Sequence, residues 1–450
     1  MNAMQDWLDR LRSHGPAPTL AEYRRNKALA LLSGAGEDIA WAELSRHENG
    51  FVREVAVRAL CSERSCEALV ALIERLNDWV AQVRELAAAG LDQYLTPAQA
   101  PALLFALDGL IALAARQRAD HGPTLLAVRG VLQAREVHDQ VYAHFLARQG
   151  KAARYLFALL LENHVGEPAL LRDALAHREL TVRLAAVSAC QALPVAQAVP
   201  LLMQAMSRPG ANVRVAVLRA LLPLLDDARP VLRTALLDAS PSIRSLARWA
   251  APRHEVDARA VLAERLDQGL PGTRQDWLGT LGLAAELNVG LAEQWLTEAL
   301  HSSWPSVRHG AVRLLGDHRL PALFEALEDP SERVFAAVID RLHPQPWAAL
   351  NAGLRATLDQ HWHALSLARR QAILHLLPGW QQLAYLLGRL DAEPVMQAFW
   401  LGQVEQWCDR QYRIVDPVTP RGERAALQQT LRNLAGAGLL KRERIARIVE

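Results

Sequence analysis

The sequence predicts an all-α fold, a right-handed superhelical solenoid made of helical hairpins. Similar segments recur about every 30 residues along much of the chain. Each period holds two stretches whose apolar residues lie three and four positions apart, as on one face of a helix, without the alternation of a strand. Because one hairpin cannot bury its apolar face alone, we expect neighbouring hairpins to stack around a continuous core.

The second helix of each period carries the repeated segment, in which an aliphatic residue and an arginine precede small and aliphatic residues. Clear copies are FVREVAVRAL at 51–60, TVRLAAVSAC at 181–190 and SVRHGAVRLL at 306–315. The first aliphatic residue of each copy is its anchor, and the anchors are Val52, Val83, Val182, Val213, Ile243, Val307 and Val334. They lie about 30 residues apart, or about two or three times that interval. Alanine four residues after an anchor lets neighbouring hairpins approach closely.

Proline and aspartate mark the junctions between the paired helices. Proline loses no hydrogen bond in the first turn of a helix, and an aspartate side chain accepts hydrogen bonds from free amides there. We therefore expect these residues to start the second helices; they are Pro209, Pro241, Pro305, Pro330, Asp78, Asp238 and Asp329.

Three parts are expected along the chain. Residues 1–35 form an N-terminal helical cap, and residues 36–345 form the solenoid, with degenerate copies near 90–165 and 255–290. Residues 346–450 form a C-terminal helical region or cap, whose longer helices are separated by the loop at 414–423. The hairpin pattern fades in this last part, so we expect a different packing there.

The repeat resembles that of the HEAT-repeat family, including its short bacterial variety related to phycobilisome lyases. The family pattern is an aspartate and proline turn, then Val-Arg, small residues and Ala-Leu, and it is matched best at 238–250 and 302–315. This resemblance implies a solenoid fold. It implies little about function, because the family includes scaffolds, transport receptors, lyases and nucleic-acid binders.

Composition favours a soluble cytoplasmic protein. The 50 basic and 48 acidic residues give a formal charge of +2, without the basic excess typical of nucleic-acid binders. Four cysteines show neither a dense disulfide framework nor Cys-x-x-Cys spacing. The longest apolar run, at 101–115, is shorter than the roughly 20 residues of a spanning helix, so we expect no membrane association.

The sequence shows no catalytic constellation. His361 and His363 lie two residues apart, which places them on different sides of a helix, and the pair His138 and Asp139 lacks further ligands at suitable spacing. No glycine-rich phosphate loop or nucleophile elbow occurs. We therefore expect no metal, no cofactor and no enzymatic activity.

Positions two and six after each anchor are predicted to face away from the core, along the concave side. These positions become cationic and aromatic between residues 215 and 313, and the candidate partner-binding residues are Arg219, Arg248, Trp249, His309 and Arg313. Such a set suits a carboxylate-rich peptide, a partner helix or a phosphate backbone. Nine of the 12 tryptophans follow residue 248, where core packing and partner binding are both open interpretations.

Two hypotheses from different classes follow. The favoured one is a non-enzymatic scaffold or adaptor that binds a protein partner on the concave face. The alternative is a nucleic-acid-binding protein or a DNA-repair glycosylase of the HEAT-like class, and a bilin lyase-like activity rests on the resemblance alone.

The recurring arginine beside each anchor is predicted to be structural. It occupies the same place in six copies, at Arg53, Arg84, Arg183, Arg214, Arg244 and Arg308. Because it recurs in every unit, we expect it to reach a carboxylate or carbonyl in the turn of a neighbouring hairpin. Phe335 replaces it in the last copy, where we expect the regular stack to begin to end.

Overall fold

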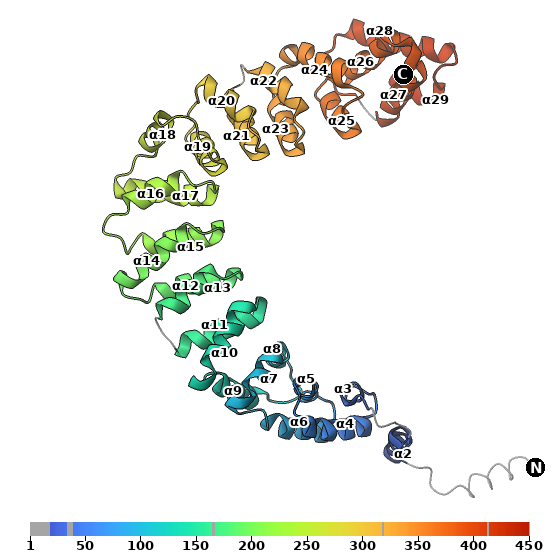
Figure 1. Cartoon of the computed structure of the whole chain (residues 1–450). Coiled ribbons are helices and arrows are strands. Elements are labelled where there is room, and N and C mark those ends of the chain that lie inside the picture. The colour runs from blue at the N-terminus through green and yellow to red at the C-terminus, as the bar shows by residue number, and fades with distance from the viewer. Residues whose placement is uncertain (1–18, 34–38, 164–166, 317–318, 412–413, 450) are drawn as a thin grey trace, which may run out of the picture. The chain divides into compact units, whose positions relative to one another are not determined.

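The structure is a computed structural model that describes residues 19–33, 39–163, 167–316, 319–411 and 414–449 (Figure 1). Every regular element in these ranges is helical, which confirms the predicted all-α class. The chain divides into two compact units, unit 1 at Met1–Asp226 and unit 2 at Asp227–Glu450. Much of the predicted N-terminal cap lies outside the described residues, apart from one helix at Leu20–Ser33.

Unit 1 contains fourteen helices among its described residues. They are α2 (Leu20–Ser33), α3 (Trp41–Leu44), α4 (Gly50–Glu63), α5 (Cys66–Arg75), α6 (Ala81–Asp92), α7 (Ala100–Phe105), α8 (Leu107–Leu113), α9 (Gly122–Leu132), α10 (His138–Ala147), α11 (Gly150–Asn163), α12 (Pro168–Ala176), α13 (Leu180–Cys190), α14 (Val195–Met206) and α15 (Ala211–Leu221). The segment predicted to be a degenerate part of the repeat, near 90–165, contains the short helices α7 and α8.

The described residues of unit 2 form another fourteen helices. They are α16 (Arg229–Leu236), α17 (Pro241–Ala250), α18 (Ala258–Asp267), α19 (Arg274–Glu286), α20 (Glu293–Leu300), α21 (Pro305–Leu314), α22 (Leu320–Glu325), α23 (Glu332–Leu342), α24 (Trp347–His361), α25 (Leu367–His375), α26 (Gly379–Ala392), α27 (Gln397–Arg410), α28 (Arg421–Gly436) and α29 (Arg442–Val449).

Within each unit the helices pack as stacked hairpins. In unit 1, α12 packs against α13 and α14 against α15, while α13 also contacts α15 and α12 contacts α14. In unit 2, α20 packs against α21, and α21 contacts both α19 and α23. In these hairpins, helices therefore meet their hairpin partner and the equivalent helix of the next hairpin, and Figure 1 shows the paired helices stacked one after another.

The anchors of the repeated segment, and the alanines four residues after them, face the core. All seven anchors are buried, from Val52 in α4 to Val334 in α23. Alanines four residues after an anchor are buried as well; they are Ala56, Ala87, Ala186 and Ala311. A small side chain at that point leaves room for the next helix, so the predicted packing role of these alanines is confirmed.

The junctions follow the prediction only in part, since Pro209 and Pro330 precede α15 and α23 instead of starting them. Pro241 and Pro305 do occupy the first positions of α17 and α21. The aspartates bond to main-chain amides that lie just before the helices. Asp78, Asp238 and Asp329 each accept from the amide two residues ahead, at 2.9, 2.7 and 2.8 Å, which closes a turn before the helix begins.

The hairpin of α18 and α19 interrupts the regular register in unit 2. A Cβ atom at Gly279 of α19 would lie 1.9 Å from the carbonyl oxygen of Leu237, so only glycine allows this approach. Gly282 similarly lies against the guanidinium of Arg244. The turn after α16 therefore meets the middle of α19, and Arg244 of α17 lies beside Gly282, in the region predicted to hold a degenerate copy.

The loop between α27 and α28 is packed onto the C-terminal helices. Asp416 is buried and accepts hydrogen bonds from the Trp380 amide at 2.9 Å and the Thr419 hydroxyl at 2.7 Å. Thr419 is buried too, and its hydroxyl lies 3.2 Å from the Gln381 amide nitrogen. The loop separates α27 from α28, as predicted, and it also ties the start of α26 to the start of α28.

Candidate functional site

The second helices expose a row of side chains, which we call the second-helix face: positions two and six after each anchor. None of these fourteen positions is buried, and all seven residues at position six are exposed. They include Arg58, Arg219, Trp249 and Arg313. The prediction that these positions point away from the core is therefore confirmed for both units.

In unit 1 the face holds one candidate, Arg219, which is exposed on α15. No ion pair or hydrogen bond of its guanidinium occurs among the described residues. By contrast, Arg58 on α4 donates to Glu54 one turn earlier at 2.9 Å, as expected from their spacing. Arg219 is thus the more available cation of this part of the face.

In unit 2 the α17 part of the face centres on Trp249, which exposes 62% of its surface. The guanidinium of Arg253 lies 3.9 Å from the centre of the Trp249 ring, a cation–π stack that sequence analysis missed. Arg248 is half-buried, and its Nε lies 3.2 Å from a carboxylate oxygen of Glu286 in α19. Arg248 is therefore paired within unit 2, whereas Trp249 remains exposed.

The α21 part of the face is a cationic cluster. Arg313 is exposed and His309 is half-buried, and Arg333 of α23, also exposed, was not among the predicted residues. Burial lowers the pKa of His309, and the charges of Arg333 and Arg313 lower it further. The imidazole is therefore neutral at pH 7, and the two arginines carry the charge of the cluster.

The candidate residues lie next to one another only where they share a helix. Arg248 and Trp249 are neighbours on α17, and His309 and Arg313 lie one turn apart on α21. Among the described residues, no hydrogen bond, ion pair or ring contact links the α17 group to the α21 group. Arg219 belongs to unit 1, so it forms a separate element of the face.

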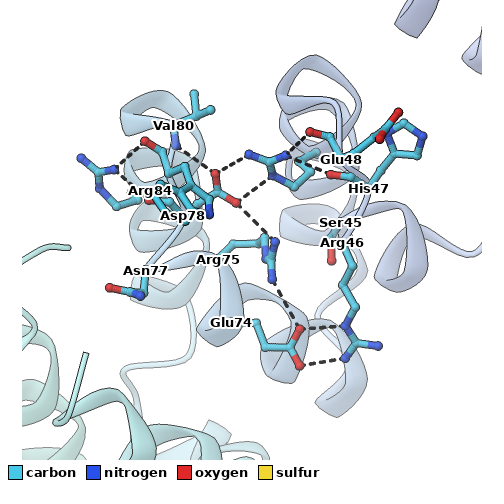
Figure 2. A network of polar contacts seen from close by, with 12 residues as sticks. Ser45, Arg46, His47, Glu48, Glu74, Arg75, Asn77, Asp78, Val80 and Arg84 are labelled. Atoms are coloured by element: carbon cyan, nitrogen blue, oxygen red, sulfur yellow. Dashed lines mark hydrogen bonds and ion pairs between the residues drawn. The ribbon is translucent and has the colours of Figure 1, made fainter. Parts of the chain in front are cut away.

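The recurring arginines form a framework beside this face, shown for unit 1 in Figure 2. Arg53 donates from Nε and Nη2 to the two oxygens of Asp78, at 2.8 and 2.7 Å, and from Nη1 to the carbonyl oxygen of His47 at 2.9 Å. Arg84 donates to the main-chain oxygen of Asp78 at 2.8 Å. One turn residue thus receives arginines from two successive second helices.

Unit 2 contains the same geometry at Asp329. Arg308 donates from Nε and Nη2 to the Asp329 carboxylate at 2.6 and 3.0 Å, and from Nη1 to the carbonyl oxygen of Ser302 at 2.8 Å. This confirms that Arg308 reaches the turn of the neighbouring hairpin. In the last copy, where Phe335 stands in place of arginine, Arg369 of α25 donates to the Asp329 carbonyl at 2.7 Å.

Two other arginines of the series also donate to acceptors in or near the turns, one to a carbonyl and one to a carbonyl and a carboxylate. Arg183 donates to the Pro209 carbonyl at 2.8 Å, and Gly210, at a φ of 115°, makes room for the guanidinium. Arg244 donates to the Asp238 carbonyl at 2.7 Å and to Glu286 at 2.6 Å. The arginine beside each anchor is therefore a structural residue, and the second-helix face begins one position further along.

The side chains of Asp78 and Asp329 are both held in the charged carboxylate form. Burial raises the pKa of Asp78, but the hydrogen bonds from Arg53 and the Val80 amide, with the charges of Arg53 and Arg75, bring the pKa below its ordinary value. For Asp329 the same balance of burial against Arg308, the Ser331 amide and Arg369 also lowers the pKa. Each carboxylate is therefore charged at neutral pH and compensated by arginine.

A further exposed tryptophan occurs in unit 1. Trp79 follows Asp78 in the turn before α6, exposes 78% of its surface, and stacks on Arg118 at 3.6 Å. Both residues line a cavity of about 460 Å³. Sequence analysis missed this stack because Arg118 lies outside the repeat, although a tryptophan placed in a turn is itself a signal of exposure.

The tryptophans after residue 248 are mostly core residues. Six of the nine are buried; they are Trp277, Trp295, Trp362, Trp380, Trp400 and Trp407. Ring pairs join them within unit 2, such as Trp277 with Trp295 at 5.5 Å and Trp362 with Trp400 at 4.8 Å. Core packing therefore explains most of this enrichment, with Trp249 as the exposed exception.

The remaining chemistry of the described residues is simple. No group of three or more His, Cys, Asp or Glu side chains in the described ranges is arranged to hold a metal ion. The four cysteines are free thiols, and burial raises the pKa of Cys190 to about 11. Within the described part of the chain, no helix has the length and apolar character that crossing a bilayer requires.

Comparison with known proteins assigns the chain to no family. No protein-family model matches the chain, and no curated protein is found to be similar to it. The functional interpretation therefore depends on the geometry of the second-helix face and its surroundings.

Proposed function

We propose that the chain is a HEAT-like superhelical solenoid that acts as a non-enzymatic scaffold or adaptor and binds a protein partner through its second-helix face. The stacked hairpins and the arginine framework support the HEAT-like assignment, because each arginine bonds the turn of its own or a neighbouring hairpin. Such a framework fixes the spacing of the second helices. It thereby presents their exposed positions as a regular surface to a partner.

The observation that carries the proposal is the Trp249–Arg253 stack. An exposed tryptophan held flat by a guanidinium offers a large apolar surface with little rotamer freedom left to lose on binding. Tryptophan and arginine are also the residues most enriched among the energetically dominant contacts of protein interfaces. The cluster of Arg313 and Arg333 adds a site for partner carboxylates.

A protein partner is favoured over a nucleic acid because the cations of this region are interrupted. Glu286 pairs with Arg244 at 2.6 Å and with Arg248 at 3.2 Å, and Arg58 pairs with Glu54. A nucleic-acid groove gains its affinity from a run of cations free to contact successive phosphates. Here the available arginines are separated by neutralised ones, which suits the discrete acidic groups of a folded partner or peptide.

The test is native co-purification from the host, followed by mass spectrometry and by quantitative binding to the partner so identified. Trp249→Ala and Arg313→Glu are each expected to weaken that binding at least about tenfold, since central contacts commonly contribute more than about 2 kcal/mol. Arg219→Glu tests the part of the face in unit 1. Arg172→Glu, an exposed reversal on the first helix α12, is the matched control and should leave the affinity unchanged.

Two outcomes contradict the proposal. One is a partner whose affinity is unaffected by Trp249→Ala, Arg219→Glu and Arg313→Glu together. The other is tight binding of duplex DNA that weakens steeply with salt, which would support the nucleic-acid alternative instead.

A further inference from the structure

A cavity of about 260 Å³ lies in unit 2 between α25, α26 and α27, apart from the second-helix face. Trp362, Trp407 and Leu374 provide apolar walls, and Arg370, Arg410 and Gln371 provide polar ones. No aspartate or glutamate lines the cavity. This composition, apolar walls with two guanidinium groups, differs from that of the cavity beside Trp79, where Glu74 and Asp78 contribute carboxylates.

The two arginines of the cavity lack acidic partners. Elsewhere in unit 2, Arg244, Arg308 and Arg369 each pair with a carboxylate at 2.6 to 2.9 Å. Among the described residues, no ion pair includes Arg370 or Arg410. Their positive charge is therefore uncompensated within unit 2, which favours an anion in the cavity.

Arg410 is nevertheless held in place. With its amide oriented so that the oxygen faces Arg410, Gln371 accepts hydrogen bonds from both Nη atoms at 3.1 Å. Gln371 lies on α25 and Arg410 at the end of α27, so the contact crosses the cavity wall. A neutral amide positions the guanidinium without neutralising it.

Two buried donors at the cavity have no acceptor. Trp362 exposes 1% of its surface, and its indole Nε1 lacks a hydrogen-bond partner, as does the Nε of Arg370. The other tryptophan of the cavity is satisfied, since the Nε1 of Trp407 donates to Gln382 at 3.2 Å. Buried donors are seldom left unpaired in folded proteins, so the unpaired indole N–H of Trp362 favours an acceptor at this cavity.

We propose that this cavity binds a small carboxylate with a planar apolar body. The carboxylate accepts from Arg370 and Arg410, since a single guanidinium carries parallel N–H groups that match the two oxygens of a carboxylate. The apolar body lies against Trp362, whose ring already has the Arg370 guanidinium 5.4 Å from its centre. Since a cavity of about 150 Å³ holds benzene, this one holds on the order of ten non-hydrogen atoms.

Isothermal titration calorimetry with 3-phenylpropionate tests the proposal on the full chain. We expect saturable binding at one site per chain, and binding of 3-phenylpropan-1-ol, which has the same body without the charge, weaker by about tenfold or more. Arg370→Met and Arg410→Met should each weaken 3-phenylpropionate by a similar factor. Trp362→Phe keeps the ring and removes the donor, and should weaken binding by about tenfold.

Arg421→Met, at the exposed start of α28, is the matched control and should bind like the original chain. Circular dichroism checks that each variant folds. The proposal is overturned if no probe binds, if inorganic phosphate binds as tightly as 3-phenylpropionate, or if Arg421→Met weakens binding as much as Arg370→Met. It is also overturned, in favour of a polypeptide C-terminus, if a tripeptide ending in a free phenylalanine carboxylate binds much more tightly.

Discussion

The turns at Asp78 in unit 1 and Asp329 in unit 2 perform the same task with different donors. In both, the aspartate side chain receives the arginine of the preceding second helix, and the aspartate carbonyl receives another guanidinium. At Asp78 that second guanidinium belongs to Arg84 of the same hairpin. At Asp329 it belongs to Arg369, because Phe335 occupies the equivalent position.

Both acceptors of the aspartate are thus filled at each turn, although the second donor comes from a different helix. Arg369 donates to the Asp329 carbonyl, contacts Glu332 at 2.9 Å, and lies 4.7 Å from the centre of the Phe335 ring. Phe335, which stands where the other copies have an arginine donor, thus provides a surface on which Arg369 packs. Burial also differs, since the side chains of Arg53 and Asp78 are 8% and 1% exposed, against 13% and 8% for Arg308 and Asp329.

The largest expected effect is that of Asp78→Ala. It leaves the buried Arg53 without its carboxylate, and removing one partner of a buried ion pair typically costs about 3–5 kcal/mol. Asp329→Ala should cost less, about 2–3 kcal/mol, because Arg308 is more exposed. Urea unfolding followed by circular dichroism measures both, and hydrogen exchange in α4 and α6 localises the change.

Glu54→Ala is the control for this comparison. It breaks only the exposed pair with Arg58, which contributes about 0.3–0.5 kcal/mol. If Asp78→Ala cost no more than Glu54→Ala, the turn would not hold neighbouring hairpins together.

Arg369→Ala should give an intermediate effect, a loss of about 1.5–3 kcal/mol in the free energy of unfolding. The variant leaves the Asp329 carbonyl without its charged donor and uncovers Phe335. Arg369→Lys should recover part of this loss, since an ammonium can donate to the carbonyl but cannot stack as a planar group. Thermal unfolding ranks the variants, and Arg333→Ala, an exposed change on α23, should be nearly neutral. Equal stability of Arg369→Ala and Arg333→Ala would contradict the conclusion that Arg369 takes the place of the arginine missing at position 335.

Mild acid should have the smallest effect, and it should act on both turns. The pKa of each aspartate is lower in the folded chain than in the unfolded chain, so their contribution to stability is complete above the unfolded value of about 3.9 and declines as the pH falls through the folded value. Midpoints of urea unfolding between pH 7 and pH 3 test this dependence. Asp78→Asn and Asp329→Asn should flatten it, and an unchanged pH profile in the double variant would show that other groups cause the loss.

Sequence repetition was sufficient to predict the helical hairpins, their buried anchors and the structural role of Arg308. The anchors recur in all seven copies and the arginine in six of them, so a pattern of residue types carries these features. The exposure of Trp249 and Arg313 followed from the same pattern, because helical geometry fixes which side of α17 and α21 faces the core.

What the sequence did not reveal are contacts made once. Arg369 reaches Asp329 from a helix outside the repeat, and Arg253 stacks on Trp249 from beyond the end of α17. The close approach at Gly279 depends on the position of a whole helix rather than on local preference. Such contacts depend on tertiary geometry, which spacing along the chain does not encode.

The arginine framework also has a direction, and this matters while the chain is being synthesised. Arg53 reaches forward to Asp78, and Arg308 reaches forward to Asp329, so each hairpin leaves the ribosome before the acidic turn that completes it. In a nascent chain that ends after α4, the guanidinium of Arg53 lacks the carboxylate of Asp78. In a chain that begins after α4, Asp78 can still accept hydrogen bonds from the Val80 amide and from Arg75. At these two turns, the carboxylate that binds the arginine of a hairpin therefore lies later in the chain than the hairpin itself.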